Sequence, residues 1–198
     1  MHVLGLHRRI SVSLQPLEYL IDPLFSILEE TDMKPFRIGG SQQLAIRHPE
    51  RVKTLALFGS TPGLKHSHAP TWIPKIKAIG LKQFLADTID ERFDSSADPE
   101  LVNWFIEQAG SNDAAFIARF VLHMCTHDFM NEVSAIKVPT LIVAAGKEKI
   151  GHASVYQEMN NRIAASELRY YDTPAHNICD GYASRCVEDL MNFLKNRS

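Results

Sequence analysis

Short runs of consecutive apolar residues alternate with amphipathic helical patterns along this chain, and the alternation constrains its fold. Strands that are buried on both faces of a parallel sheet read as continuous apolar runs, and the crossover helices between them cover the two faces. The sequence therefore predicts an α/β fold with a mostly parallel sheet and flanking helices. The expected strands are residues 2–6, 36–40, 54–59, 139–146 and 168–172, and the expected helices include residues 17–28, 155–163 and 186–194.

A long helical stretch interrupts this rhythm between two of the strands. Residues 62–135 contain no strand-like run and predict helices over residues 76–89, 99–109 and 111–124, with Asp98 as an N-cap. In α/β proteins the ligand site lies at the carboxyl ends of the strands, and we expect the insertion to cover that edge as a lid. The expected parts are residues 1–61 and 136–198, which form the α/β core, and residues 62–135, which form the helical lid.

The composition excludes several functional classes. The 198 residues carry a net charge of −2, with 45% hydrophobic and 22% charged residues, which is typical of a globular domain. Lys and Arg are scattered, so a nucleic-acid partner is not expected, and no apolar run approaches the roughly 20 residues of a membrane span. Three cysteines leave at least one thiol unpaired, so we expect a reduced, cytoplasmic compartment.

Three polar side chains suited to attack on a carbonyl group each follow an expected strand. Ser41 follows two glycines at the end of residues 36–40, where a sharp turn into a helix would expose its hydroxyl. Glu148 and His176 follow the last two expected strands and offer a carboxylate and an imidazole. A serine, an acid and a histidine in this chain order predict a nucleophile with a general base and its orienting group.

Three segments resemble the α/β-hydrolase superfamily, in the branch of esterases, enol-lactonases and carbon–carbon-bond hydrolases. They are residues 45–57, which resemble the segment after the nucleophile; residues 137–143, which resemble the strand before the acid; and residues 175–190, which resemble the histidine loop and last helix. The helical insertion is similar to the lids of the same branch.

The resemblance implies a serine hydrolase that needs no metal ion and no organic cofactor. Ser41 would attack the carbonyl carbon, His176 would act as general base and then acid, and Glu148 would orient His176. The resemblance also implies positions for binding the oxyanion and the substrate, which are Gly40, Gln42 and, in the lid, Trp72.

The sequence departs from the family pattern near the nucleophile and at the acid. Gln43 stands where the family pattern G-x-S-x-G has its last glycine, and Ser41 lies four residues before Ala45, where the family has about ten. We therefore expect the helix behind Ser41 to be short. Lys149 occupies the usual position of the acid, which makes Glu148 the best remaining candidate. The chain shows no His-Gly motif for a second oxyanion N–H group.

Each candidate also has a purely structural interpretation. Ser41 is alternatively a helix cap, His176 a loop histidine bonded to backbone, and Glu148 a solvated carboxylate between two lysines. Other histidines lie in pairs, but neither pair has an evident third ligand or a metal-binding motif, so we expect no metal site. These pairs are His66 with His68 and His123 with His127.

The sequence thus favours a serine hydrolase for a small ester, lactone or related carbonyl substrate. The alternative is a degenerate, non-catalytic α/β-hydrolase-like binding protein or an inactive isoform. A sheet that begins at residues 2–6 lacks the strands that precede this position in the family, so we expect an exposed edge that favours a homodimer or aggregation.

Overall fold

The computed structural model describes residues 40–195, apart from residues 66 and 127. The chain divides into two compact units, residues 1–41 and residues 42–198. The second unit contains all the described elements except the first two residues of helix α2. The elements expected over residues 2–6, 17–28 and 36–39 lie outside the described residues.

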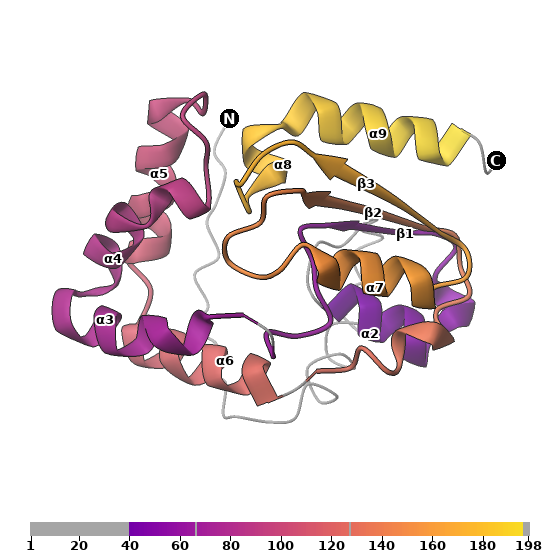
Figure 1. Cartoon of the computed structure of the whole chain (residues 1–198), viewed down its shortest axis with the longest axis horizontal. Coiled ribbons are helices and arrows are strands. Elements are labelled where there is room, and N and C mark those ends of the chain that lie inside the picture. The colour runs from indigo at the N-terminus through magenta and orange to yellow at the C-terminus, as the bar shows by residue number, and fades with distance from the viewer. Residues whose placement is uncertain (1–39, 66, 127, 196–198) are drawn as a thin grey trace, which may run out of the picture. The chain divides into compact units, whose positions relative to one another are not determined.

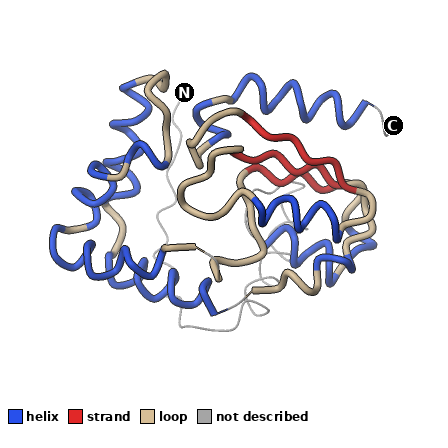
Figure 2. The backbone as a smooth tube through the Cα atoms, viewed as in Figure 1, coloured by secondary structure: helices blue, strands red, loops and turns tan. Residues whose placement is uncertain are grey.

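Three parallel strands form the described sheet, in the order β1-β2-β3 (Figures 1 and 2). They are β1 (Leu55–Phe58), β2 (Thr140–Ala145) and β3 (Ser166–Tyr171). Thr140 is paired with Leu55 on one side and Ser166 on the other. Every residue of β2 is buried, as its central position requires. The three strands confirm the strands predicted from the apolar runs, and their bounds shift by at most two residues.

Helices cover both faces of the sheet, and the two faces take alternate residues of β2 (Figure 1). Ile142 faces α2 (Gly40–Arg47) and α7 (Ser154–Arg162), where it packs with Tyr156 and Met159. On the other face, Leu141 and Val143 pack with residues of α8 (Ile178–Gly181) and α9 (Ala183–Lys195). This two-sided packing confirms the predicted α/β class with flanking helices. Gly40, which was expected to end a strand, is instead the first residue of α2.

The insertion between β1 and β2 is helical, as predicted, but its first long helix is broken. The expected helix over residues 76–89 is two helices, α3 (Trp72–Ile79) and α4 (Leu81–Asp87), which meet at Gly80. Gly80 has a φ of 83°, a backbone conformation that glycine adopts readily and that ends an α-helix. The periodicity of the apolar residues continues across this break, and for that reason the sequence pattern missed it.

The two later helices of the insertion depend on aspartate caps. Asp98 accepts a hydrogen bond from the N–H of Glu100 at 2.9 Å and begins α5 (Pro99–Gly110), as predicted. Asp113 accepts bonds from the N–H groups of Ala115 and Phe116, so α6 (Ala114–Thr126) begins three residues later than predicted. The short 3-10 helices are η1 (Pro49–Arg51), η2 (Ala69–Thr71), η3 (Ile89–Glu91) and η4 (Val133–Ala135).

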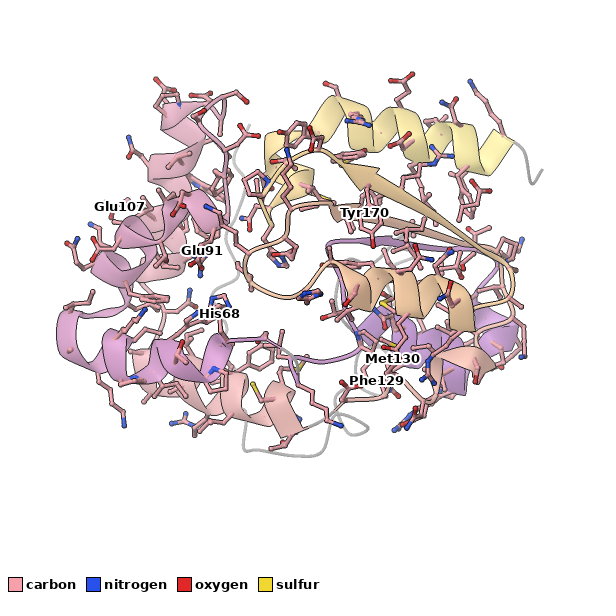
Figure 3. All side chains as sticks on the ribbon, in the orientation of Figure 1. His68, Glu91, Glu107, Phe129, Met130 and Tyr170 are labelled. Carbon is pink, nitrogen blue, oxygen red and sulfur yellow. The ribbon has the colours of Figure 1, made fainter. Side chains whose placement is uncertain are left out.

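The insertion has a small apolar core of its own, in which Ile76, Phe84 and Leu85 are buried. Its last residues pack elsewhere: Phe129, labelled in Figure 3, and Val133 belong to the buried cluster on the α2 and α7 face of the sheet. None of the described helices combines the length and the apolar character needed to cross a membrane.

Ile142 at the centre of β2 provides a test of this packing. We expect Ile142→Ala to lower the free energy of unfolding by about 2–5 kcal/mol, because the side chain is 0% exposed and its loss leaves a cavity between sheet and helices. Val187→Ala, at a position 58% exposed on α9, is the control and should change stability by less than about 0.5 kcal/mol. Urea unfolding measures both, and equal effects would contradict the burial of Ile142 between the two layers.

Candidate active site

The loops that follow β2 and β3 run side by side at the carboxyl edge of the sheet. The ladder between the two strands continues beyond their ends, because the N–H of Gly146 donates to the carbonyl of Tyr171 at 2.7 Å. The N–H of Lys147 likewise donates to the carbonyl of Thr173 at 3.0 Å. The loop that carries Glu148 is therefore held beside the loop that carries His176.

The side chains at the end of the β2 loop alternate between solvent and interior. Lys147 and Lys149 are 63% and 45% exposed and form ion pairs with Asp172 and Asp90, whereas the side chain of Glu148 between them is 1% exposed. The interpretation of Glu148 as a solvated carboxylate is therefore wrong. The turn and bend that follow β2 place the side chain of Glu148 on the inner side of the loop, between two outward-facing lysines.

Glu148 contacts the imidazole of His176 directly. Its Oε2 lies 2.9 Å from Nδ1 of His176, within the range expected for an orienting acid. The other oxygen, Oε1, accepts a hydrogen bond from the N–H of Ile150 at 2.9 Å. An ionised carboxylate only accepts hydrogen bonds, so this contact requires a proton on Nδ1 of His176 and leaves Nε2 as the ring nitrogen that faces away from Glu148.

Burial and hydrogen bonding act in opposite directions on this carboxyl. Burial raises the pKa of Glu148, but the hydrogen bond and charge of His176 and the backbone N–H groups of Ile150 and Gly151 lower it, and the net pKa lies below the ordinary value. Tyr156 on α7 adds a longer contact, 3.4 Å from its hydroxyl to Oε2 of Glu148. Burial first, and the neighbouring carboxylate second, raise the pKa of Tyr156 well above its ordinary value, so its hydroxyl remains a donor.

The backbone of His176 lies against the end of β1 and against the insertion. A Cβ atom on Gly59 would lie 3.1 Å from the carbonyl oxygen of His176, and Gly59 has a φ of 59°. Only glycine therefore suits this position, for both space and conformation. The N–H of His176 donates to the carbonyl of Glu91 at 3.0 Å, so the insertion takes part in placing the histidine.

The proposed nucleophile and its neighbours lie in the first turn of α2. Ser41 is the second residue of this eight-residue helix and is partly buried. The helix is short, as the spacing to Ala45 predicted. Gln42 is buried, and its Nε2 donates to the carbonyl and the hydroxyl of Ser60, just beyond β1, at 3.3 and 3.1 Å. The oxyanion roles of Gly40 and Gln42 stay predictions, since they concern backbone N–H groups.

Trp72 begins α3 and packs within the insertion. Its ring lies 6.0 Å from the ring of Phe84 and 5.7 Å, edge-on, from that of His68. His68 in turn lies 3.7 Å from Oε2 of Glu91, and Figure 3 shows these two side chains together on the insertion. Trp72 thus packs, partly buried, against the core of the insertion, and its contact with substrate stays a prediction.

The described residues contain no group of three or more His, Cys, Asp or Glu side chains that could hold a metal ion. His66 and His127, one member of each histidine pair, lie outside the described residues. Sequence reasoning missed Tyr156, because it reads as one more apolar position on the buried face of α7. It also missed Asp94, whose carboxylate accepts hydrogen bonds from Thr173 and Tyr182, two residues far along the chain.

Comparisons with known proteins agree with this architecture. No family model matches the sequence. The chain is 27% identical over 165 residues to the AB hydrolase superfamily protein YisY of Bacillus subtilis; the match covers 75% of this chain and 60% of that protein, so the chain spans less than two thirds of this curated relative.

Several solved structures share the fold. A hydrolase from Pseudomonas aeruginosa is 19% identical with a TM-score of 0.74, and the match covers 90% of this chain and 71% of the hydrolase chain. An esterase from Exiguobacterium antarcticum is 17% identical with a TM-score of 0.76, over 87% and 71%. An enol-lactonase from Burkholderia xenovorans is 18% identical with a TM-score of 0.76, over 90% and 73%. The resemblance drawn from the sequence is confirmed at the level of the fold.

The buried carboxylate predicts a specific dependence of stability on pH. Because the folded-state pKa of Glu148 lies below the unfolded value of about 4.3, the ionised group stabilises the fold above that pH. This contribution is lost as the pH falls through the folded pKa. We expect the wild type to be more stable than Glu148→Gln at pH 6, and the difference to shrink as the pH is lowered to 3.

Urea unfolding at a series of pH values measures this difference. Glu188→Gln, at an exposed position of α9, is the control for the loss of one surface carboxylate. A difference between the wild type and Glu148→Gln that grows with acidity would contradict a lowered folded-state pKa.

Proposed function

We propose that this chain, whose fold is that of the α/β-hydrolase superfamily, hydrolyses a small ester, lactone or related carbonyl compound with Ser41, Glu148 and His176. The observation that carries the proposal is the 2.9 Å contact between the buried Glu148 carboxylate and Nδ1 of His176. A buried carboxylate on one ring nitrogen is what a histidine needs in order to act as a base through the other.

The proposed mechanism has two half-reactions. Nε2 of His176 accepts the hydroxyl proton of Ser41 while Oγ bonds to the carbonyl carbon, and the resulting imidazolium is stabilised by Glu148. Collapse of the tetrahedral intermediate breaks the bond to the leaving oxygen, which takes the proton from His176. Water, activated by His176, then attacks the acyl group and releases the acid and Ser41. The backbone N–H of Gln42, in the first turn of α2, is the proposed oxyanion donor.

The glutamate fits this role despite its position one residue before the usual acid. A glutamate is one methylene longer than an aspartate, and that length compensates for a shift of one residue along the loop. The contacts of Glu148 with Ile150 and Tyr156 fix the direction in which the carboxylate faces His176. Fixed orientation of the acid supports the proposal, because it holds the imidazole in one tautomer.

The relatives support the substrate class at the same coarse level. The solved structures with this fold include proteins described as a hydrolase, an esterase and an enol-lactonase. An ester and an enol-lactone share an acyl–oxygen bond, which is the bond that the proposed mechanism breaks. Because the fold does not determine the substrate, the identity of the acyl group is left to experiment.

A fluorophosphonate probe tests the nucleophile directly. We expect the folded wild type to be labelled on Ser41, because an activated serine displaces fluoride from the probe and retains the phosphonyl group. Labelling should be lost in Ser41→Ala and weakened in His176→Gln, and mass spectrometry of the labelled peptide identifies the modified residue.

Ser134→Ala is the control for this experiment, because Ser134 lies at an exposed position of η4 and contacts none of the proposed site residues. It should leave the labelling of Ser41 unchanged. Labelling confined to a serine other than Ser41, or no labelling of folded protein, would contradict the proposed nucleophile and favour the non-catalytic alternative.

The role of the acid has a kinetic test. We expect Glu148→Ala to lower kcat for a small activated ester by up to about 10⁴-fold with little change in KM, because the histidine loses its tautomer and orientation. Steady-state kinetics measure both constants. Glu188→Ala, at an exposed position of α9, is the control and should leave kcat unchanged. An unchanged kcat in Glu148→Ala would remove Glu148 from the mechanism.

A further inference from the structure

Five consecutive residues of the insertion, Asp90 to Asp94, touch both loops that form the Glu148–His176 pair. At one end, the carboxylate of Asp90 lies 2.6 Å from Nζ of Lys149, the residue directly after Glu148. This ion pair joins the insertion to the acid loop across 59 positions of sequence. We call residues 90–94 the bridging segment.

The middle of the bridging segment holds the histidine loop through backbone bonds. The carbonyl of Glu91 accepts from the N–H of His176 at 3.0 Å, and the carbonyl of Arg92 accepts from the N–H of Asn177 at 2.9 Å. Two successive backbone bonds of this kind fix the position and direction of the loop at His176 itself. Substituting the side chains of Glu91 or Arg92 does not remove these backbone carbonyls. Whether the carbonyls hold His176 therefore depends on the position of the bridging segment.

The far end of the bridging segment binds the start of the histidine loop and the residue just after α8 through one carboxylate. Oδ2 of Asp94 accepts from the hydroxyl of Thr173 at 3.2 Å and from the hydroxyl of Tyr182. Thr173 precedes His176 by three residues and is buried, and its Oγ1 also accepts from the N–H of Ala175 at 3.1 Å. Asp94 therefore links the residues on either side of the segment that contains His176 and α8.

The residues between these contacts fasten the bridging segment to the insertion. Arg92 is buried, and its guanidinium donates to the carbonyl and the hydroxyl of Thr88 at 3.0 Å and lies over the rings of Trp72 and Phe84. Phe93 is buried with its ring 5.3 Å from that of Phe105. The segment is therefore anchored on one side and presents its two aspartates to the loops on the other.

We propose that the bridging segment aligns Glu148 with His176 and that Asp94 is its principal positioning residue. The inference rests on the proposed function only for its catalytic consequence, because the alignment itself is a property of the fold. Loss of the Asp94 contacts would loosen the chain on both sides of His176 while the acid loop stays in place. The imidazole would then no longer be held against Glu148 in one tautomer.

The electrostatic state of Asp94 agrees with a permanent anchor. Hydrogen bonds from Ser96 and Tyr182 outweigh the effect of burial and lower the pKa of Asp94 to about 2. The carboxylate is therefore charged throughout the range in which an esterase would be assayed, and its contacts weaken only as the pH falls from about 4 toward 2.

The test uses the ¹⁵N chemical shifts of the His176 imidazole, which report its tautomer and do not require activity. The signals are assigned by their loss in His176→Gln. In the wild type we expect the tautomer with the proton on Nδ1, and in Asp94→Asn and Tyr182→Phe a mixture of both tautomers. In the same variants kcat should fall by about 10–100-fold with KM nearly constant, as for a small misplacement of a catalytic group.

Asp113→Asn is the matched control, because Asp113 also binds backbone N–H groups of the insertion but contacts neither loop. It should leave both the shifts and kcat unchanged. Tyr182→Phe removes a single hydroxyl and keeps the proposal testable if Asp94→Asn does not fold. Wild-type imidazole shifts in either folded variant would overturn the positioning role.

The two proposals fail in different ways. If the wild type hydrolyses no ester but the shifts change in Tyr182→Phe, the alignment stands and the proposed function falls. If the wild type is active and neither the shifts nor kcat change in the variants, the proposed function stands and the bridging segment has no positioning role.

Discussion

The hydrogen bonding of the buried Glu148 carboxylate is the interaction on which the rest of the site depends. A charge removed from water is costly unless other groups satisfy it, and the ring of His176, the N–H of Ile150 and the hydroxyl of Tyr156 do so. These partners come from three different segments. The carboxylate therefore determines how the β2 loop, the β3 loop and α7 meet.

This meeting is possible because β2 and β3 are parallel neighbours. Parallel pairing brings both carboxyl ends to one edge, and the pairing of Lys147 with Thr173 continues the strand register into the loops. Gly59, at the end of β1, leaves the room that the backbone of His176 occupies. The sheet thus positions both loops, and Gly59 at its edge allows the backbone of His176 to lie close to β1.

The helical insertion takes part in building the site at this edge of the sheet. It leaves the sheet after β1 and returns before β2, and in between it places the carbonyls of Glu91 and Arg92 against the histidine loop. Arg92 of the bridging segment lies over the ring of Phe84, which belongs to the apolar core of the insertion. The placement of the histidine is therefore shared between the sheet and the insertion, as is usual for a site built from loops on a stable scaffold.

Local patterns in the sequence determined the three described strands, the start of α5 at Asp98 and the order in which the candidate acid and histidine occur. Each depends on neighbours within a few residues, through apolar runs, caps and turns. The break at Gly80 was missed because the apolar period continues through it, and the late start of α6 was missed because residues 111–113 were counted as helical although Asp113 caps the helix from outside. Only the tertiary structure decided that Glu148 points inward and that Asp94 reaches Tyr182. Those facts depend on strand register and on contacts between segments far apart in the chain, which no local pattern contains.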